Sequence, residues 1–238
     1  MKTKLLKLAL AFFILNAESL LAQFSPEDTV LVDIQKINPR IIVEIKYATE
    51  DNFTGKKLYD VPKCFLRKFV ALKLDSVQRE LEKVGLGLKV WDCYRPLSVQ
   101  KILWSIVPDE RYVANPAKGS RHNRGCAVDL TLVDSLGNEL PMPTKYDDFT
   151  EKAHRDYYNL PDTVIKNRKI LEDVMKKYGF IPLPTEWWHF DAQGWENFSI
   201  LDIPLKELNK KIKKGVKARP FCLCSSAIIF DVSLLLLG

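Results

Sequence analysis

The feature that most constrains the fold is one apolar stripe between residues 66 and 84. Its members recur at spacings of four, three, four and three residues, and they are Val70, Leu74, Val77, Leu81 and Val84. This spacing predicts an amphipathic α-helix that buries one face and ends at Gly85. The apolar run Leu88–Tyr94 follows directly and is typical of a buried strand. The chain therefore contains both a helix with one buried face and a buried strand.

The other segments do not follow the regular strand–helix–strand order of a parallel fold. Strand patterns lie at Thr29–Ile34, Arg40–Ile45 and Ala127–Val133, and a bend followed by a strand is expected over Phe180–Phe190. We expect Ser98 to cap a helix through about Ile106, and Asp162 to cap another that Gly179 closes. We predict an α+β fold: a single domain with a central, mostly antiparallel sheet flanked by helices, and a functional site at the sheet edge or cleft.

The first residues are typical of an export signal. MKTK supplies positive charge, LLKLALAFFIL is a short apolar run, and NAESLLAQ offers small residues for cleavage after Ala22 or Ser19. The run is too short for a comfortable membrane span. We interpret residues 1–22 as a signal peptide and expect an exported, periplasmic protein. A buried N-terminal helix is the alternative.

The positive charge of the chain is concentrated near its C-terminus. The net charge is +6, and residues 206–219 contain six Lys, one Arg and one Glu, which also sum to +6. The rest balances to zero, so no basic face for nucleic acid is predicted. We expect the folded domain over 23–208. Residues 209–238 form a basic and then apolar tail, which would dock on the domain, associate with a membrane surface or reflect a frameshift.

The five cysteines are an odd number, and none has the CxxC spacing of a structural zinc site. In an oxidising compartment Cys64 and Cys93 could pair, but sequence alone does not fix the connectivity. Cys126 has small neighbours, which favours a buried side chain.

Two of the three histidines lie in strongly patterned stretches. In GSRHNRGCAVD, Asp129 lies on a predicted strand and His122 on the loop before it, with Gly125 as a permissive turn residue. A carboxylate on such a strand needs a charge partner or a metal. A metal shared with His122 is one interpretation, and an ion pair of Asp129 with a nearby arginine is the other.

The second stretch is TEWWHF, in which Glu186 precedes His189 by three residues. With His122 and Asp129, His189 would complete three protein ligands and leave the fourth position of a tetrahedral zinc to water. Glu186 is then the candidate base. On a flat strand these two side chains would point to opposite faces, so a bend or bulge is required. A core histidine bonded to a backbone carbonyl is the structural alternative.

The third stretch, VWDCYRP, places Arg95 at the end of a predicted strand, where active-site residues often lie. An ion pair at the surface is the alternative.

Together these stretches resemble the zinc D,D-peptidases. SRHNRGCAVDL matches their S-x-H-x-x-G-x-A-x-D motif, and EWWHF matches E-x-W-H. IKYATEDNFTGKKLY and GLKVWDCYRPLSVQ are similar to the D-alanyl-D-alanine dipeptidase branch, and the resemblance covers about residues 28–208.

The resemblance implies a role for each matching position. His122, Asp129 and His189 match the ligands of one zinc ion per chain, and Glu186 matches the catalytic base. Arg95 matches the arginine that polarises the scissile carbonyl. The substrate-binding positions are Asp147 for the free ammonium, with Asp148 adjacent, and more weakly Tyr47 and Ser120. His154 matches no ligand position.

The implied activity is hydrolysis of the dipeptide D-Ala-D-Ala to two D-alanines in cell-wall peptide turnover. Binding both termini of a dipeptide requires a small closed pocket with opposite charges. A D,D-carboxypeptidase or endopeptidase acting on peptidoglycan stem peptides is the alternative, and a zinc-retaining wall-binding module without catalysis is a third. The sequence leaves the oligomeric state open.

Overall fold

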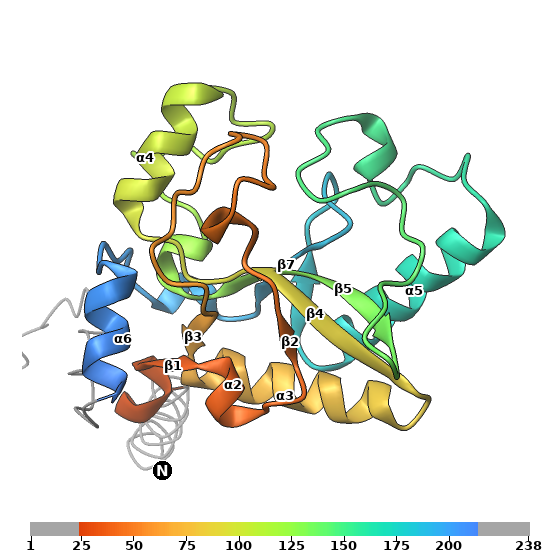
Figure 1. The fold of residues 1–238 in the computed structure, drawn as a ribbon, viewed down its shortest axis with the longest axis horizontal. Helices are drawn as coiled ribbons and strands as arrows, with labels where there is room; N and C mark the ends of the chain where they lie inside the picture. Colours follow the sequence, from red (N-terminus) through yellow and green to blue (C-terminus); the bar gives the residue numbers. More distant parts are fainter. Residues whose placement is uncertain (1–23, 214–238) are drawn as a thin grey trace, which may run out of the picture.

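The computed structural model describes residues 24–213 and has the predicted α+β architecture (Figure 1). A five-stranded sheet has the order β2-β4-β5-β7-β6. Its strands are β2 (Ile42–Val43), β4 (Leu86–Asp92), β5 (Ala127–Asp134), β6 (Phe180–Pro182) and β7 (His189–Ala192). Only the β2–β4 pair is parallel among these strands, and the other three pairs are antiparallel. The mostly antiparallel sheet is thereby confirmed.

Two long helices pack on one side of this sheet. The helices are α3 (Lys68–Glu82), which contacts β4, and α5 (Asp162–Lys177), which contacts β5 and β6. The predicted stripe of α3 is buried at Val70, Leu74, Val77 and Leu81, whereas Val84 lies beyond the helix and is exposed. Gly85 follows with a φ of 73°, the left-handed conformation that ends helices.

The long loops and α4 (Leu97–Ile106) lie on the side opposite α3 (Figure 1). Along β5 the side chains alternate, so Val128, Leu130 and Leu132 share one face while Asp129 and Thr131 share the other. All five are buried. The polar face of β5 is therefore covered by loops, and this arrangement positions the site.

Both predicted helix caps were wrong by one residue or more. The helix α4 begins at Leu97 with Pro96 at the cap position, and the Ser98 amide instead donates to Oδ1 of Asp202 at 2.8 Å. Likewise α5 begins at Asp162 itself, after Pro161. In both helices the proline supplies an extended residue immediately before the first turn, so the polar residue lies within the helix.

Four further elements were not predicted or were predicted too long. The expected strand Thr29–Ile34 is β1 (Leu31–Asp33), which is followed by the short helix α2 (Ile34–Ile37) because Asp33 caps it. β1 pairs with β3 (Phe65–Arg67) in a separate two-stranded sheet. The expected strand Arg40–Ile45 is only β2.

The basic segment begins as the helix α6 (Leu205–Lys213), which buries Leu205 and Leu208. This helix crosses residue 208, where we expected the domain to end. The predicted signal peptide, Cys222, Cys224 and the tail beyond Lys213 lie outside the described residues. Within residues 24–213, none of the helices has the length and apolar character needed to cross a membrane.

Cys64 and Cys93 form a disulfide, which is the pairing that the sequence left open. Cys126 is the free cysteine among the described residues, and it is buried. Burial raises the pKa of its thiol to about 12, so the side chain stays neutral.

Candidate metal centre

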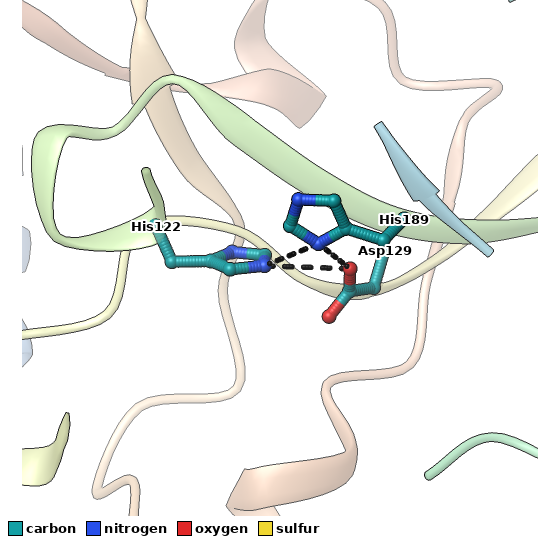
Figure 2. A group of neighbouring side chains, drawn as sticks. All are labelled: His122, Asp129 and His189. Atoms are coloured by element: carbon teal, nitrogen blue, oxygen red, sulfur yellow. Dashed lines mark hydrogen bonds and ion pairs between the residues drawn. The ribbon is translucent and has the colours of Figure 1, made fainter. Parts of the chain in front are cut away.

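Three side chains from three elements meet on the loop-covered face of the sheet (Figure 2). His122 lies in the 3-10 helix η3 (His122–Arg124), Asp129 on β5 and His189 at the start of β7. Asp129 and His189 are direct partners in the antiparallel register. Gly125, at a φ of 69°, ends η3 in the left-handed conformation and turns the chain into β5. The three side chains therefore converge on the central strands of the sheet, not on its outer edge.

The facing atoms of this triad have the spacing of metal ligands. Nδ1 of His189 lies 2.9 Å from Oδ1 of Asp129 and 3.2 Å from Nε2 of His122. Nε2 of His122 lies 3.3 Å from the same Asp129 oxygen. Ligands bound at about 2.0–2.1 Å to a tetrahedral zinc lie roughly 3.3–3.4 Å apart. Two imidazoles and one carboxylate also suit that ion chemically, so these residues fit a zinc ion.

Each histidine is oriented through its other ring nitrogen. Nδ1–H of His122 donates to the Cys93 carbonyl oxygen at 2.7 Å. Nε2–H of His189 donates to Oδ1 of Asp191 at 2.9 Å. Because a carbonyl or carboxylate oxygen only accepts, these bonds direct the proton of each neutral imidazole to its outer nitrogen, so that the facing nitrogen would be the one available to a metal ion.

The field at this position favours a cation. Burial alone raises the pKa of Asp129, but the charges of His122 and His189 and their hydrogen bonds outweigh it and hold that pKa below its ordinary value. Burial lowers the pKa of His189, yet Asp191 and Asp129 raise it well above its ordinary value. Positive charge between the two carboxylates is therefore stabilised, whether a proton or a metal ion supplies it.

Glu186 lies beside the triad on a turn, not on a strand. The Glu186 amide donates to Leu183 O, and the His189 amide donates to Glu186 O, so the strand β7 begins only at His189. This turn is the bend that the sequence required. Burial, with a further contribution from the Asp129 charge, raises the pKa of Glu186 to about 7.

Arg95 follows the end of β4 and lines the same cavity as the triad. It forms a buried ion pair, in which Nη2 donates to Oδ2 of Asp92 at 2.7 Å and Nη1 donates to Gln100 at 2.8 Å. The alternative of an Arg95 ion pair at the protein surface is thus excluded. These contacts, with the Nε bond to Asp92, use three of the five guanidinium N–H groups.

The predicted substrate-binding residues lie around the same cavity, which has a volume of about 170 Å³. Asp147 has a φ of 59°, and its carboxylate accepts from the Tyr47 hydroxyl at 3.1 Å. Burial, and then the charge of Asp129, raise the pKa of Asp147 well above its ordinary value. Ser120 is buried and accepts from the His122 amide through Oγ at 3.2 Å. His154 lies outside the cavity lining and outside the triad.

The sequence reasoning missed three residues that contact the predicted site. Asp92 holds Arg95, Asp191 holds His189, and the Tyr146 hydroxyl donates to Oδ2 of Asp129 at 2.9 Å. Asp92 and Asp191 were recoverable, since Asp92 lies in VWDCYRP three residues before Arg95, and Asp191 directly follows TEWWHF, two residues after His189. No local pattern relates Tyr146 to Asp129.

Three aromatic rings from three loops line part of the cavity. Phe53 and Phe149 have ring centroids 5.2 Å apart, and Phe149 stacks on Tyr112 at 4.9 Å. These rings, with the small volume, favour a small ligand over an extended chain.

Comparisons with known proteins agree with this arrangement. Residues 27–206 match the Peptidase M15 family, described as D-ala-D-ala dipeptidase. The chain is 37% identical over 175 residues to the D-alanyl-D-alanine dipeptidase of Escherichia coli (strain K12), covering 74% of this chain and 91% of that protein. It is 33% identical over 168 residues to the D-alanyl-D-alanine dipeptidase of Enterococcus faecalis (strain ATCC 700802 / V583), covering 62% and 83%.

Proposed function

Because this chain belongs to the Peptidase M15 family of D-Ala-D-Ala dipeptidases, we propose that it is a zinc metallopeptidase that hydrolyses D-Ala-D-Ala to two D-alanines. The observation that carries this function is the joining of a His–Asp–His triad, Glu186, Arg95 and Asp147 in one cavity of about 170 Å³. That set supplies a metal site, a base, a cation and an anion around a space suited to a dipeptide.

His122, Asp129 and His189 would hold one zinc ion through the three atoms that face one another. The ion, when bound, supplies a Lewis acid and brings water into reach at a lowered pKa. Asp191 and the Cys93 carbonyl keep the two imidazoles in the metal-binding tautomers.

Glu186 is placed to hold the proton that the attacking water loses. A carboxylate with a pKa of about 7 accepts a proton near neutral pH and can return it to the leaving amine. Glu186 therefore acts first as base and then as acid, and the second D-alanine leaves with a neutral amino group.

Arg95 and Asp147 would orient two groups of the substrate, the scissile carbonyl and the free ammonium. The guanidinium of Arg95, fixed by Asp92, would donate to the carbonyl oxygen where negative charge develops. The buried carboxylate of Asp147, which meets the Tyr47 hydroxyl, would bind the free ammonium of the substrate. That ammonium would supply the positive charge that the raised pKa of Asp147 indicates is needed there.

We further propose that the protein is exported to the periplasm and acts in turnover of cell-wall peptides. The N-terminal signal pattern and the Cys64–Cys93 disulfide both support an oxidising compartment. In that location the enzyme would meet dipeptides released from the wall.

The alternative activity is a D,D-carboxypeptidase or endopeptidase acting on stem peptides. Release of D-alanine from free D-Ala-D-Ala and from a pentapeptide ending in D-Ala-D-Ala separates the two functions. We expect kcat/KM to be at least about 100-fold higher for the dipeptide, since in the pentapeptide an amide replaces the free ammonium that Asp147 would bind beside the scissile bond. A preference for the pentapeptide would contradict the dipeptidase assignment.

A further inference from the structure

We propose that the Cys64–Cys93 disulfide positions the metal centre, so that breaking it weakens zinc binding and turnover in a protein that remains folded. This inference rests on the proposed function, because it concerns the zinc ligand His122 and the arginine Arg95. The disulfide would be a positioning element that acts through the backbone of Cys93, with no contact of its own to the substrate.

The link between the disulfide and the ligand is one short hydrogen bond. The Cys93 carbonyl accepts from Nδ1–H of His122 at 2.7 Å, and both residues are buried. This bond sets the tautomer of His122 and the direction of its Nε2 lone pair. A shift of the Cys93 carbonyl would therefore turn the ring or release its tautomer.

Cys93 lies just after the last residue of β4, so the hydrogen-bond ladder of the five-stranded sheet no longer fixes its position. The β4–β5 ladder is already irregular between Val90 and Asp92, and β4 ends at Asp92. Beyond it, the Tyr94 amide donates to the Phe65 carbonyl at 2.9 Å. The disulfide is the covalent tie of this segment, and it joins Cys93 to the residue that precedes β3.

The same segment and β3 hold the loop of His122 from two sides. The Arg67 amide on β3 donates to the Gly125 carbonyl at 2.9 Å, next to η3. The Arg95 amide donates to the His122 carbonyl at 3.1 Å, and Nδ2 of Asn123 donates to the Arg95 carbonyl at 2.9 Å. The disulfide thus completes a closed path of contacts. It joins β3 to Cys93, the segment after Cys93 is hydrogen-bonded to η3, and Gly125 after η3 is hydrogen-bonded back to β3. His122 and Arg95 both lie on this path.

The test compares the zinc dissociation constant of the wild-type protein with that of a Cys64→Ala/Cys93→Ala variant, measured by competition with a chromophoric chelator. Loss of an outer contact to a ligating histidine costs about 10–100-fold in metal affinity, and we expect about tenfold here. We also expect kcat to fall. The control is Cys126→Ala, which removes a buried thiol but no covalent tie, and its dissociation constant should stay within about twofold.

Because both cysteines are buried, a second preparation guards against misfolding of the variant. Folded wild-type protein is reduced with a water-soluble phosphine, which takes one oxygen from water to give the phosphine oxide and two thiols. The phosphine is then removed without air before zinc is added. A similar weakening of zinc binding, with near-UV circular dichroism retained, would support the proposal.

Two outcomes would overturn it. One is an unchanged zinc dissociation constant in folded protein that lacks the bond. The other is loss of the fold in both preparations, which would assign the disulfide to global stability alone. Neither outcome touches the proposed function, which would instead fail if oxidised wild-type protein bound no zinc or did not hydrolyse D-Ala-D-Ala.

Discussion

Oε2 of Glu186 lies 3.8 Å from Nδ1 of His189, the nitrogen that faces Asp129 and His122. His189 follows Glu186 by three positions, yet the two side chains share one side of the chain because the turn ends only where β7 begins. A proton acceptor beside the facing atoms of the triad is the geometry that metal-assisted hydrolysis requires. This relationship is the basis of the first prediction.

Glu186→Gln should keep zinc and lose turnover. The amide has nearly the same shape but does not accept a proton, so kcat should fall about 10²–10⁴-fold. Zinc content by elemental analysis and kcat for D-Ala-D-Ala are the two measurements. Glu151→Gln, an exposed change at the start of the 3-10 helix Glu151–Ala153, is the control. An unchanged kcat would remove Glu186 from the mechanism.

Asp129→Ala should lose the metal. Loss of a residue that only hydrogen-bonds to a metal ligand already lowers metal affinity about 10–100-fold, so removal of a ligand itself should lower zinc affinity more than about 100-fold. Asp134→Ala, at the far end of the same strand, should bind zinc normally. Stoichiometric zinc in purified Asp129→Ala protein would refute the ligand assignment.

Asp147→Asn should weaken recognition of the free amino terminus. Removing one partner of a buried charge pair costs about 3 kcal/mol or more, so KM should rise about 100-fold. The wild-type protein should strongly prefer D-Ala-D-Ala over its N-acetyl form, and the variant should lose most of that preference. If the variant prefers D-Ala-D-Ala over the N-acetyl form as strongly as the wild type does, the substrate ammonium binds elsewhere.

Glu80→Gln should destabilise the fold in a pH-dependent way. Hydrogen bonds from Lys177 on α5 and from Lys83 lower the pKa of Glu80 from 4.5 to about 2. A lowered carboxyl pKa contributes stability above about pH 4.5, and this stability is lost as the pH falls through about 2. The Tm difference between wild type and variant should therefore be largest near neutral pH and shrink in acid. A difference that stays constant with pH would contradict this assignment.

The sequence was most informative where chemistry and local geometry coincide. Asp129 could be placed on one face of a strand by alternation, and Gly125 as the turn before it, since both depend on neighbours in the chain. The helix α3 was predictable for the same reason, because its stripe repeats over four turns. His189 was predicted as the third ligand because it is one of only three histidines and follows Glu186 in a patterned stretch, and the resemblance supported that prediction. No spacing relates it to Asp129, which lies 60 residues away.

Contacts between distant loops were beyond prediction. The Tyr146 hydroxyl reaches Asp129 only because the loop after β5 folds back over the sheet, and loop paths have no periodic signal. The Ser98 cap failed for a related reason: the carboxylate of Asp202, 104 residues away, accepts the hydrogen bond from the first turn of α4 that a capping side chain would accept. The Asp191–His189 bond is different, because residues two apart on a strand share a face and the pair was recoverable.

The central claim is zinc-dependent hydrolysis of a D,D-dipeptide, and a chiral dipeptide panel with and without chelator tests it most directly. The account predicts that D-Ala-D-Ala yields two D-alanines, that L-Ala-L-Ala is not cleaved, that a chelator abolishes the reaction and that added zinc restores it. Cleavage of the L,L-dipeptide at a similar rate, or full activity in metal-free protein, would contradict the account.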